Sequence, residues 1–346
     1  MDPNSPVEAL APLRISFVGG GTDFPHWFDE HGGAVMSATI DHFVNVRIQP
    51  RQDRQVRVRS VDLGHLVEYH LDEGPRYDGV LDLAKAAIAR IGASSGIDVS
   101  IASEAPAGSG LGGSSALVTA VAAGLAMLGN HEYSRHELAR LSYAIEREDL
   151  KISGGWQDQY AAAFGGFNLI EFEREGVKIS PVSVDAEALT RLHQGLLLCY
   201  TGAVRRSAGL IDAQIEMYRA GREETLLGMK QLAEMARPMR QAIESGDVNV
   251  LGAMLAEAFE AKRRMNPYIA DHTPIEQMLS AARAAGATGG KICGAGGGGY
   301  LLVACSPDSR EAVASQLHRL GGQIAPFSFF PRGVTAVRGD RTWVPA

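Results

Sequence analysis

The sequence has few cysteines, and their spacing is not that of a metal site. Only Cys199, Cys293 and Cys305 occur in 346 residues, an odd number without the paired spacing of zinc sites or disulfide frameworks. Two of them lie inside apolar runs, which is typical of buried thiols in a reducing compartment. We therefore expect a cytoplasmic protein that has no cysteine-based metal cage.

Long apolar runs and an excess of positive charge are also lacking. The most apolar stretch, residues 117–128, covers twelve residues, fewer than the roughly 20 that a membrane span needs. The first six residues have neither the basic nor the apolar segment of a secretory signal. A net charge of -7 gives no nucleic-acid-binding footprint. We expect neither a membrane nor a nucleic acid as a partner.

What is present is an ordinary globular composition, with 45% hydrophobic residues. The length favours two domains, and a change of texture after about residue 185 predicts domains at 1–180 and 190–346. Both parts mix helix and strand patterns, so the expected class is α+β. Helices are expected over 79–92, 114–129, 134–150, much of 205–262, 273–286 and 306–321, and strands within 34–48, 56–61, 66–71, 97–101, 300–305 and 322–337.

Glycine is abundant, with 40 residues, and it is concentrated in three loops. The middle loop, PAGSGLGGSSA at 106–116, lies between a predicted strand and a predicted helix. Its glycines let the backbone approach a ligand closely. The uncapped N–H groups and the positive dipole end of the following helix favour an anion. A phosphate chain suits such a loop, and Ser114 and Ser115 can add hydroxyls for the phosphate or for a bridging metal ion.

Two other phosphate-binding motifs fit this loop less well. A Walker loop needs a lysine, and 104–116 contains none. Gly108, Gly110 and Gly113 match the dinucleotide fingerprint, but that fold needs a strand ending in an acidic residue about 20 residues later. Here Glu132 falls between two predicted helices. A dinucleotide-dependent oxidoreductase therefore remains only a rival interpretation.

The first glycine loop follows an apolar strand that carries Arg14, and its Thr22 and Asp23 suit hydrogen bonds to sugar hydroxyls. An Asx turn is the alternative role for Asp23. The third loop, 291–300, joins two predicted strands, and its run of four glycines allows it to lie against a ligand.

The three loops together resemble those of the GHMP small-molecule kinases, from about residue 10 to the end of the sequence. PAGSGLGGSSA is similar to that family's phosphate-binding signature, with Gly113 where a first serine is usual, and GAGGGGY at 294–300 is similar to its C-terminal glycine motif. The resemblance implies an N-terminal domain like domain 2 of ribosomal protein S5 and a ferredoxin-like C-terminal domain. It also implies an active site between them that uses ATP and Mg²⁺.

The resemblance also implies roles for individual residues. Asp158 matches the catalytic aspartate, for which a helix N-cap is the alternative role, and Arg14 matches the basic residue that stabilises the transferring group or tunes the aspartate. Ser114 and Glu146 match the Mg²⁺ ligands, with Ser115 and Glu148 left open as substitutes. The residues expected to bind ATP are Pro106, Gly108, Ser109, Gly110, Leu111, Gly112, Gly113, Ser114 and Ser115.

Segments 11–25, 154–168, 200–208 and 289–300 resemble the sugar 1-kinase branch of the family. This implies phosphorylation of the anomeric hydroxyl of a heptose 7-phosphate, giving a 1,7-bisphosphate for nucleotide-heptose and surface polysaccharide synthesis. Fucose, galactose or a uronic acid are alternative substrates, and a non-catalytic regulator that binds sugar and ATP is an alternative function. The oligomeric state is left open, a homo-oligomer included.

The sugar is expected to contact the first and third loops and an arginine pair. These residues are Gly20, Gly21, Thr22, Asp23, Arg205, Arg206, Gly296 and Gly297. Arg205 and Arg206 are adjacent guanidinium groups that could clamp a substrate phosphate, although a solvated helix start would also explain them. Lys262, Arg263 and Arg264 are the reserve candidates for this clamp.

Overall fold

The computed structural model describes residues 4–202, 207–269 and 274–346. In this part of the chain, nine strands form one sheet around the long pair β1 (Val7–Val18) and β2 (Gly33–Pro50). Every second residue of β1 from Val7 to Phe17 is buried, because alternate side chains of a strand point to the same face. The other strands are β3 (Gln55–Ser60), β4 (His65–His70), β5 (Ile97–Ser103), β6 (Phe167–Glu173), β7 (Gly176–Pro181), β12 (Thr335–Arg338) and β13 (Arg341–Trp343).

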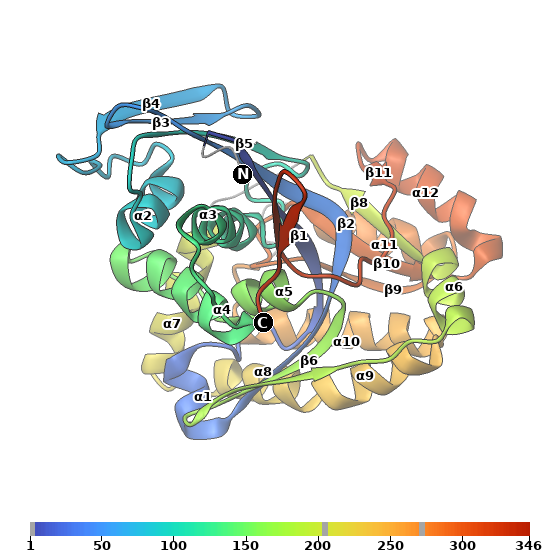
Figure 1. Ribbon diagram of the computed structural model, residues 1–346. Coiled ribbons are helices and arrows are strands. Elements are labelled where there is room, and N and C mark those ends of the chain that lie inside the picture. The colour runs from blue at the N-terminus through green and yellow to red at the C-terminus, as the bar shows by residue number, and fades with distance from the viewer. Residues whose placement is uncertain (1–3, 203–206, 270–273) are drawn as a thin grey trace.

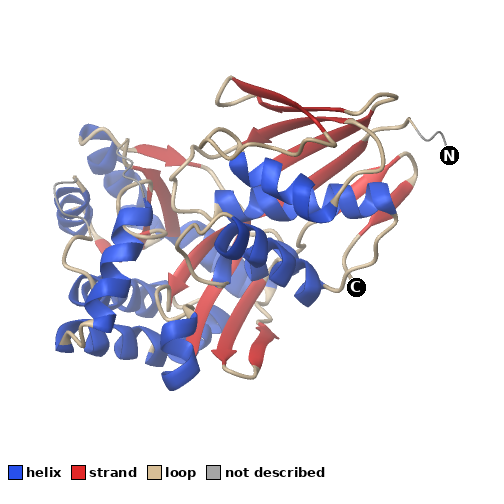
Figure 2. Cartoon of the chain, turned by 90° about the vertical axis from the view of Figure 1, so that its left-hand side faces the viewer, coloured by secondary structure: helices blue, strands red, loops and turns tan. Residues whose placement is uncertain are grey.

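A layer of helices covers one face of this sheet (Figure 2). In its central member, α3 (Gly113–Gly129), every residue from Ser115 to Met127 except the partly buried Leu117 is buried, as expected for a helix that is apolar nearly all round. Around it lie α2 (Asp82–Ile91), α4 (Arg135–Tyr143) and α5 (Gln157–Phe164), while α1 (Pro25–His31) packs on β6. The central helix therefore begins within the middle glycine loop at 106–116, called the phosphate loop below, and packing in the core fixes its position.

Two predicted helix boundaries differ from the structure. The helix predicted over 79–92 begins only at Asp82, because Gly79 and Leu81 have positive φ angles of 89° and 54°. The helix predicted over 134–150 does begin with a capping box between Ser134 and Glu137. It changes after Tyr143 into a π-helical turn, η1 (Ala144–Asp149), a feature that hydrophobic periodicity cannot reveal.

A second sheet of four antiparallel strands has the order β11-β8-β10-β9 among the described residues. The strands are β8 (Leu196–Tyr200), β9 (Ala287–Ile292), β10 (Tyr300–Cys305) and β11 (Gln323–Ala325). With helices before β9 and after β10, this order is that of a ferredoxin-like βαββαβ unit, as expected. Cys199, Cys293 and Cys305 are buried free thiols in and beside this sheet, also as expected.

Helices fill the space around the second sheet and between the two sheets (Figure 1). Helix α10 (Val248–Met265) packs on β9 and β10 and also reaches β1. The remaining helical elements are α6 (Ala186–Gly195), α7 (Ser207–Arg219), α8 (Glu223–Glu234), α9 (Ala236–Ser245), α11 (Ile275–Ala284), η2 (Pro307–Ser309) and α12 (Arg310–Arg319). None of the helices in the described part of the chain is long and apolar enough to cross a membrane.

The last two strands of the chain belong to the first sheet and not to the second. Strand β12 pairs with β1, and β13 pairs with β12, so residues 335–343 extend the first sheet (Figure 1). The predicted second domain, 190–346, therefore contains strands that belong structurally to the first. Sequence order alone could not show this, since short strands carry no mark of the sheet that they join.

Candidate active site

A cavity of about 880 Å³ lies where the three glycine loops converge. Residues of β1, the phosphate loop, the segment before α5, α10 and the β9–β10 loop line it. The predicted site residues that line it are Arg14, Gly20, Gly21, Asp23, Pro106, Gly108, Ser109, Gly110, Gly112, Gly113, Ser114 and Asp158, together with the reserve candidate Lys262. Residues predicted from segments far apart along the chain therefore line one cavity.

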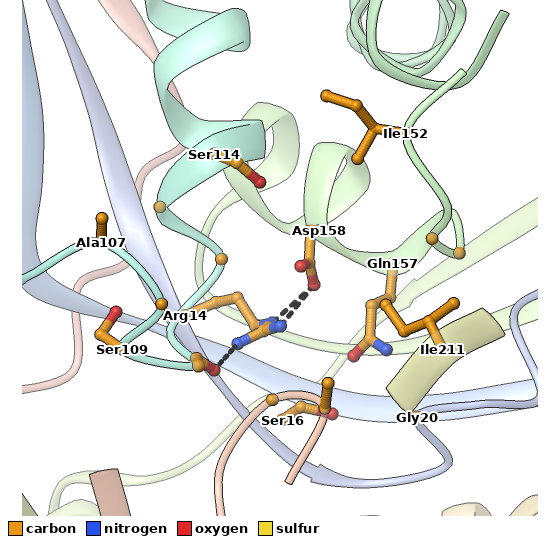
Figure 3. A pocket seen from close by; sticks show the side chains of 18 of the residues that line it. Arg14, Ser16, Gly20, Ala107, Ser109, Ser114, Ile152, Gln157, Asp158 and Ile211 are labelled. Atoms are coloured by element: carbon orange, nitrogen blue, oxygen red, sulfur yellow. Dashed lines mark hydrogen bonds and ion pairs between the residues drawn. The ribbon is translucent and has the colours of Figure 1, made fainter. Parts of the chain in front are cut away.

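Arg14 connects three of these elements. It lies on β1 between two irregularities of the β1–β2 ladder, and its side chain is 5% exposed. The guanidinium donates from Nε to Asp158 Oδ1 at 2.7 Å and from one terminal nitrogen to Gly110 O at 2.7 Å. The other terminal nitrogen lies 2.6 Å from the same Asp158 oxygen. Figure 3 shows Arg14 between the phosphate loop and Asp158. Its side chain therefore fixes the distance between the loop and the carboxylate.

Asp158 is the second residue of α5, and its side chain is 21% exposed. The N-cap position of α5 belongs to Trp156, so the alternative role of Asp158 as an N-cap is wrong. Its Oδ1 is held by Arg14, whereas Oδ2 accepts no hydrogen bond from the described residues. A carboxylate has four acceptor positions on its two oxygens. Asp158 therefore has free acceptor capacity at the cavity.

The phosphate loop presents backbone rather than side chains. Gly108, Gly110 and Gly112 have positive φ angles between 75° and 80°, a region that disfavours residues with a Cβ atom. No side chain caps the N-terminus of α3. Its first N–H groups therefore remain available for an anion.

The third glycine loop supports the phosphate loop. A Cβ atom on Gly294 would lie 2.4 Å from the Gly110 Cα, and one on Gly299 would lie 2.2 Å from Ser109 O. Tyr300 N donates to Ser109 O at 3.1 Å, which ties the two loops together. Gly296 and Gly297, predicted to contact the sugar, do not line the cavity. A Cβ atom on Gly296 would meet Ile269 instead.

In the first glycine loop, Thr22 and Asp23 have different positions. Thr22 is fully buried and donates to Gly19 O at 2.8 Å; it does not line the cavity, so the loop itself uses its hydroxyl. Asp23 accepts from Gly21 N at 2.9 Å and from Gln157 N at 3.1 Å. Burial, together with the nearby Asp158, raises the pKa of Asp23 above its ordinary value, against the effect of these N–H donors.

The predicted metal ligands differ in how far they are buried. Ser114 is exposed at the cavity, whereas Ser115 and Glu146 are fully buried and do not line it. Glu146 Oε1 accepts from Gln159 at 2.7 Å. Its Oε2 lies 3.5 Å from the Arg147 guanidinium but, like Ser115 Oγ, has no hydrogen-bond partner in the described part of the chain. Free buried oxygens of this kind fit a hard cation.

The arginine pair predicted to clamp the substrate, Arg205 and Arg206, lies outside the described residues. Of the reserve candidates, Arg263 and Arg264 are on the surface of α10, where they pair with Glu276 and Glu224. Only Lys262 turns into the cavity.

Sequence reasoning missed some cavity residues. Lys291, Gln157 and Arg147 also line the cavity. The signal for Lys291 was present in the sequence, because it is the one charged residue of the strand segment ATGGKI.

Comparison with known proteins matches both halves of the chain to one family. The model of the GHMP kinases N terminal domain matches residues 79–166, and that of the GHMP kinases C terminal domain matches residues 239–323. The chain is 32% identical over 341 residues to a D-glycero-alpha-D-manno-heptose 7-phosphate kinase of Campylobacter jejuni, covering 96% of this chain and 99% of the relative.

Two further comparisons are informative. A crystal structure described as a D-glycero-D-manno-heptose 1-phosphate kinase from Bacteroides thetaiotaomicron superimposes with a TM-score of 0.79 at 28% identity, covering 96% of this chain and 99% of that one. A bifunctional fucokinase/GDP-fucose pyrophosphorylase of Arabidopsis thaliana is 26% identical over 84% of this chain, which spans 29% of that relative.

The contact between the phosphate loop and the third glycine loop predicts that a side chain at Gly110 lowers the stability of the protein. Gly110→Ala should lower the free energy of unfolding by about 2–4 kcal/mol, because its φ is +80° and the new Cβ atom would lie 2.7 Å from Cys293 O. Gly113→Ala is the matched control, since nothing lies within 4 Å of its Cβ position. Denaturant unfolding measures both variants. Equal stability of the two would show that the loops do not pack as described.

The buried ammonium group of Lys262 predicts a pH-dependent stability. Burial and the neighbouring Lys291 and Arg14 lower the pKa of Lys262 to about 7, against the smaller effects of Cys293 and Asp23. Between this value and the unfolded value near 10.4, the unfolded chain binds more protons, so this contribution to stability increases as the pH rises. Relative to Lys262→Met, wild type should gain on the order of 2 kcal/mol from pH 7 to 9. Parallel denaturation curves for the two proteins would contradict this.

Proposed function

Because the chain belongs to the GHMP kinase family, we propose that it transfers the γ-phosphoryl group of ATP to the anomeric hydroxyl of D-glycero-D-manno-heptose 7-phosphate. The product is the 1,7-bisphosphate. The observation that carries the proposal is Asp158, whose Oδ1 is held by Arg14 and whose Oδ2 accepts no hydrogen bond from the described residues. Similarity over nearly its whole length to a heptose 7-phosphate kinase favours the substrate.

In the proposed reaction, the anomeric oxygen attacks the γ-phosphorus and the bond to the ADP oxygen breaks. Asp158 Oδ2 orients the hydroxyl and accepts its proton. Arg14 keeps the carboxylate in place and places positive charge beside the group in transfer. Phosphoryl transfer has a loose transition state, so positioning and charge neutralisation supply most of the rate. A side chain fixed on both sides, as Arg14 is, suits that requirement.

On the donor side, GHMP kinases use ATP, generally with Mg²⁺. We assign the ATP phosphates to the N–H groups of the phosphate loop and of the first turn of α3, where no side chain competes. We assign Mg²⁺ to Ser114, which is exposed at the cavity, and to Glu146, with Ser115 as the alternative serine. Glu146 and Ser115 lie behind the residues that line the cavity, and each has a buried oxygen without a hydrogen-bond partner among the described residues, which suits this ion. Mg²⁺, when bound, neutralises charge on the phosphates.

On the acceptor side, Gly20, Gly21 and Asp23 line the cavity next to Asp158. The backbone of this loop and the remaining acceptor positions of the Asp23 carboxylate are suited to sugar hydroxyls. Thr22 supports the loop through Gly19 and Ala34. Fucose is the second candidate acceptor, because a fucokinase-containing protein is also similar over most of this chain.

Asp158→Asn tests the proposed base. The amide retains the size of the side chain but cannot accept the proton, so kcat should fall by about 10²- to 10⁴-fold. The KM for ATP should change by less than about threefold, since the phosphate loop is intact. Steady-state ADP release measures both constants, with exposed Asp29→Asn as the control. Turnover close to wild type would remove Asp158 from the chemistry.

The acceptor is tested by supplying wild-type protein and ATP with heptose 7-phosphate, unphosphorylated heptose, fucose or galactose. We expect the heptose 7-phosphate to have the highest kcat/KM, with mass spectrometry showing a bisphosphate. A preference for fucose would move the assignment to the second candidate. If no sugar releases ADP although ATP binds, the non-catalytic regulator becomes the better interpretation.

A further inference from the structure

Two buried lysines line the cavity without a carboxylate partner. Lys262 on α10 is 7% exposed and Lys291 on β9 is 3% exposed. Lys262 Nζ donates to Gly294 O, and Lys291 Nζ donates to Ser16 O at 2.7 Å. Each ammonium group has three donors, yet each has only one acceptor among the described residues. No acidic group in that part of the chain forms an ion pair with either.

None of the aspartates that line the described part of the cavity forms an ion pair with either lysine. Four aspartates line it: Asp158 is held by Arg14, Asp82 pairs with Lys85, Asp23 accepts from Gly21 and Gln157, and Asp62 accepts from Ser60. Arg14 adds a third cation, which lowers the pKa of both Lys262 and Lys291, after the larger effect of burial. Three cationic side chains therefore lie on this side of the cavity, and only Arg14 forms an ion pair with a carboxylate among the described residues.

Lys85 is a buried lysine that, unlike Lys262 and Lys291, has carboxylate partners. Its side chain is 3% exposed, and Asp82 and Asp78 lie 2.6 and 2.8 Å from Nζ. Burial alone would lower the pKa of Lys85, but hydrogen bonds to these two carboxylates raise it. Lys262 and Lys291 have no such carboxylate within hydrogen-bond distance among the described residues, and an anion bound in the cavity would accept from their remaining donors.

We infer that Lys262 and Lys291 form an anion site that binds a phosphate group of a substrate. Two observations support this inference: four of the six ammonium donors have no acceptor among the described residues, and neither lysine forms an ion pair with a carboxylate there. The inference rests on the proposed function only for the origin of the phosphate. It can belong to the sugar phosphate or be the group in transfer from ATP, and the chemistry of the site is the same for both.

Binding of inorganic phosphate tests the site without any sugar. Calorimetric titration of wild type with phosphate should show saturable binding that Lys262→Met weakens by about ten- to a hundredfold, while Lys262→Arg retains most of it. Lys230→Met is the matched control, because Lys230 is exposed on α8 and pairs with Glu234. Lys291→Met provides a second variant should Lys262→Met not fold. Unchanged phosphate affinity in a folded Lys262→Met or Lys291→Met protein overturns the inference.

Kinetics with the preferred acceptor identify the phosphate. A rise of ten- to a hundredfold in the KM for the sugar phosphate, with kcat within threefold, assigns the site to the substrate's own phosphate. A fall in kcat with the KM values unchanged assigns it to the group in transfer. Kinetic constants equal to those of wild type overturn both assignments. If phosphate binding depends on Lys262 but no heptose phosphate is turned over, the anion site stands and the proposed substrate fails.

Discussion

Arg14 is the constraint around which the cavity is built. A guanidinium is planar and always charged, so one side chain can bind two partners at fixed angles. Here the partners are the Asp158 carboxylate on α5 and the Gly110 carbonyl of the phosphate loop. The backbone N–H of the same residue donates to Leu111 O. Strand β1 thus holds the proposed base and the proposed phosphate site through a single residue, and the position of each depends on the other.

A second constraint on the cavity is the close approach of two glycine loops, which depends on the absence of Cβ atoms. Gly110 and Gly294 approach so closely that neither could carry a Cβ atom. The loop from the second sheet can therefore lie directly on the loop from the first. Side chains at these positions would separate the loops and enlarge the cavity. Much of the glycine in the third loop thus serves contact between loops, and of its described residues Lys291, Gly294 and Ala295 line the cavity.

The sequence predicted the fold class and most elements, because hydrophobic periodicity and glycine loops are local signals. It also predicted that Arg14, Asp23, Asp158 and the phosphate loop belong to one site, since the motif resemblance covered three separate segments. It could not show that Thr22 turns away from the cavity or that Gly296 packs on Ile269. Those outcomes depend on long-range packing. The same is true of Lys262, whose neighbours Arg263 and Arg264 look equivalent in sequence but pair with glutamates at the surface.

The late strands β12 and β13 have a consequence for how the molecule assembles. Residues 335–343 complete an edge of the first sheet, yet they are synthesised after the whole second sheet. During translation, the outer side of β1 therefore lacks this partner while the ferredoxin-like unit is already emerging. An uncovered strand edge can pair wrongly with other chains. Pairing across more than 300 residues also slows folding, so the first sheet should be completed only after the last strands have been synthesised.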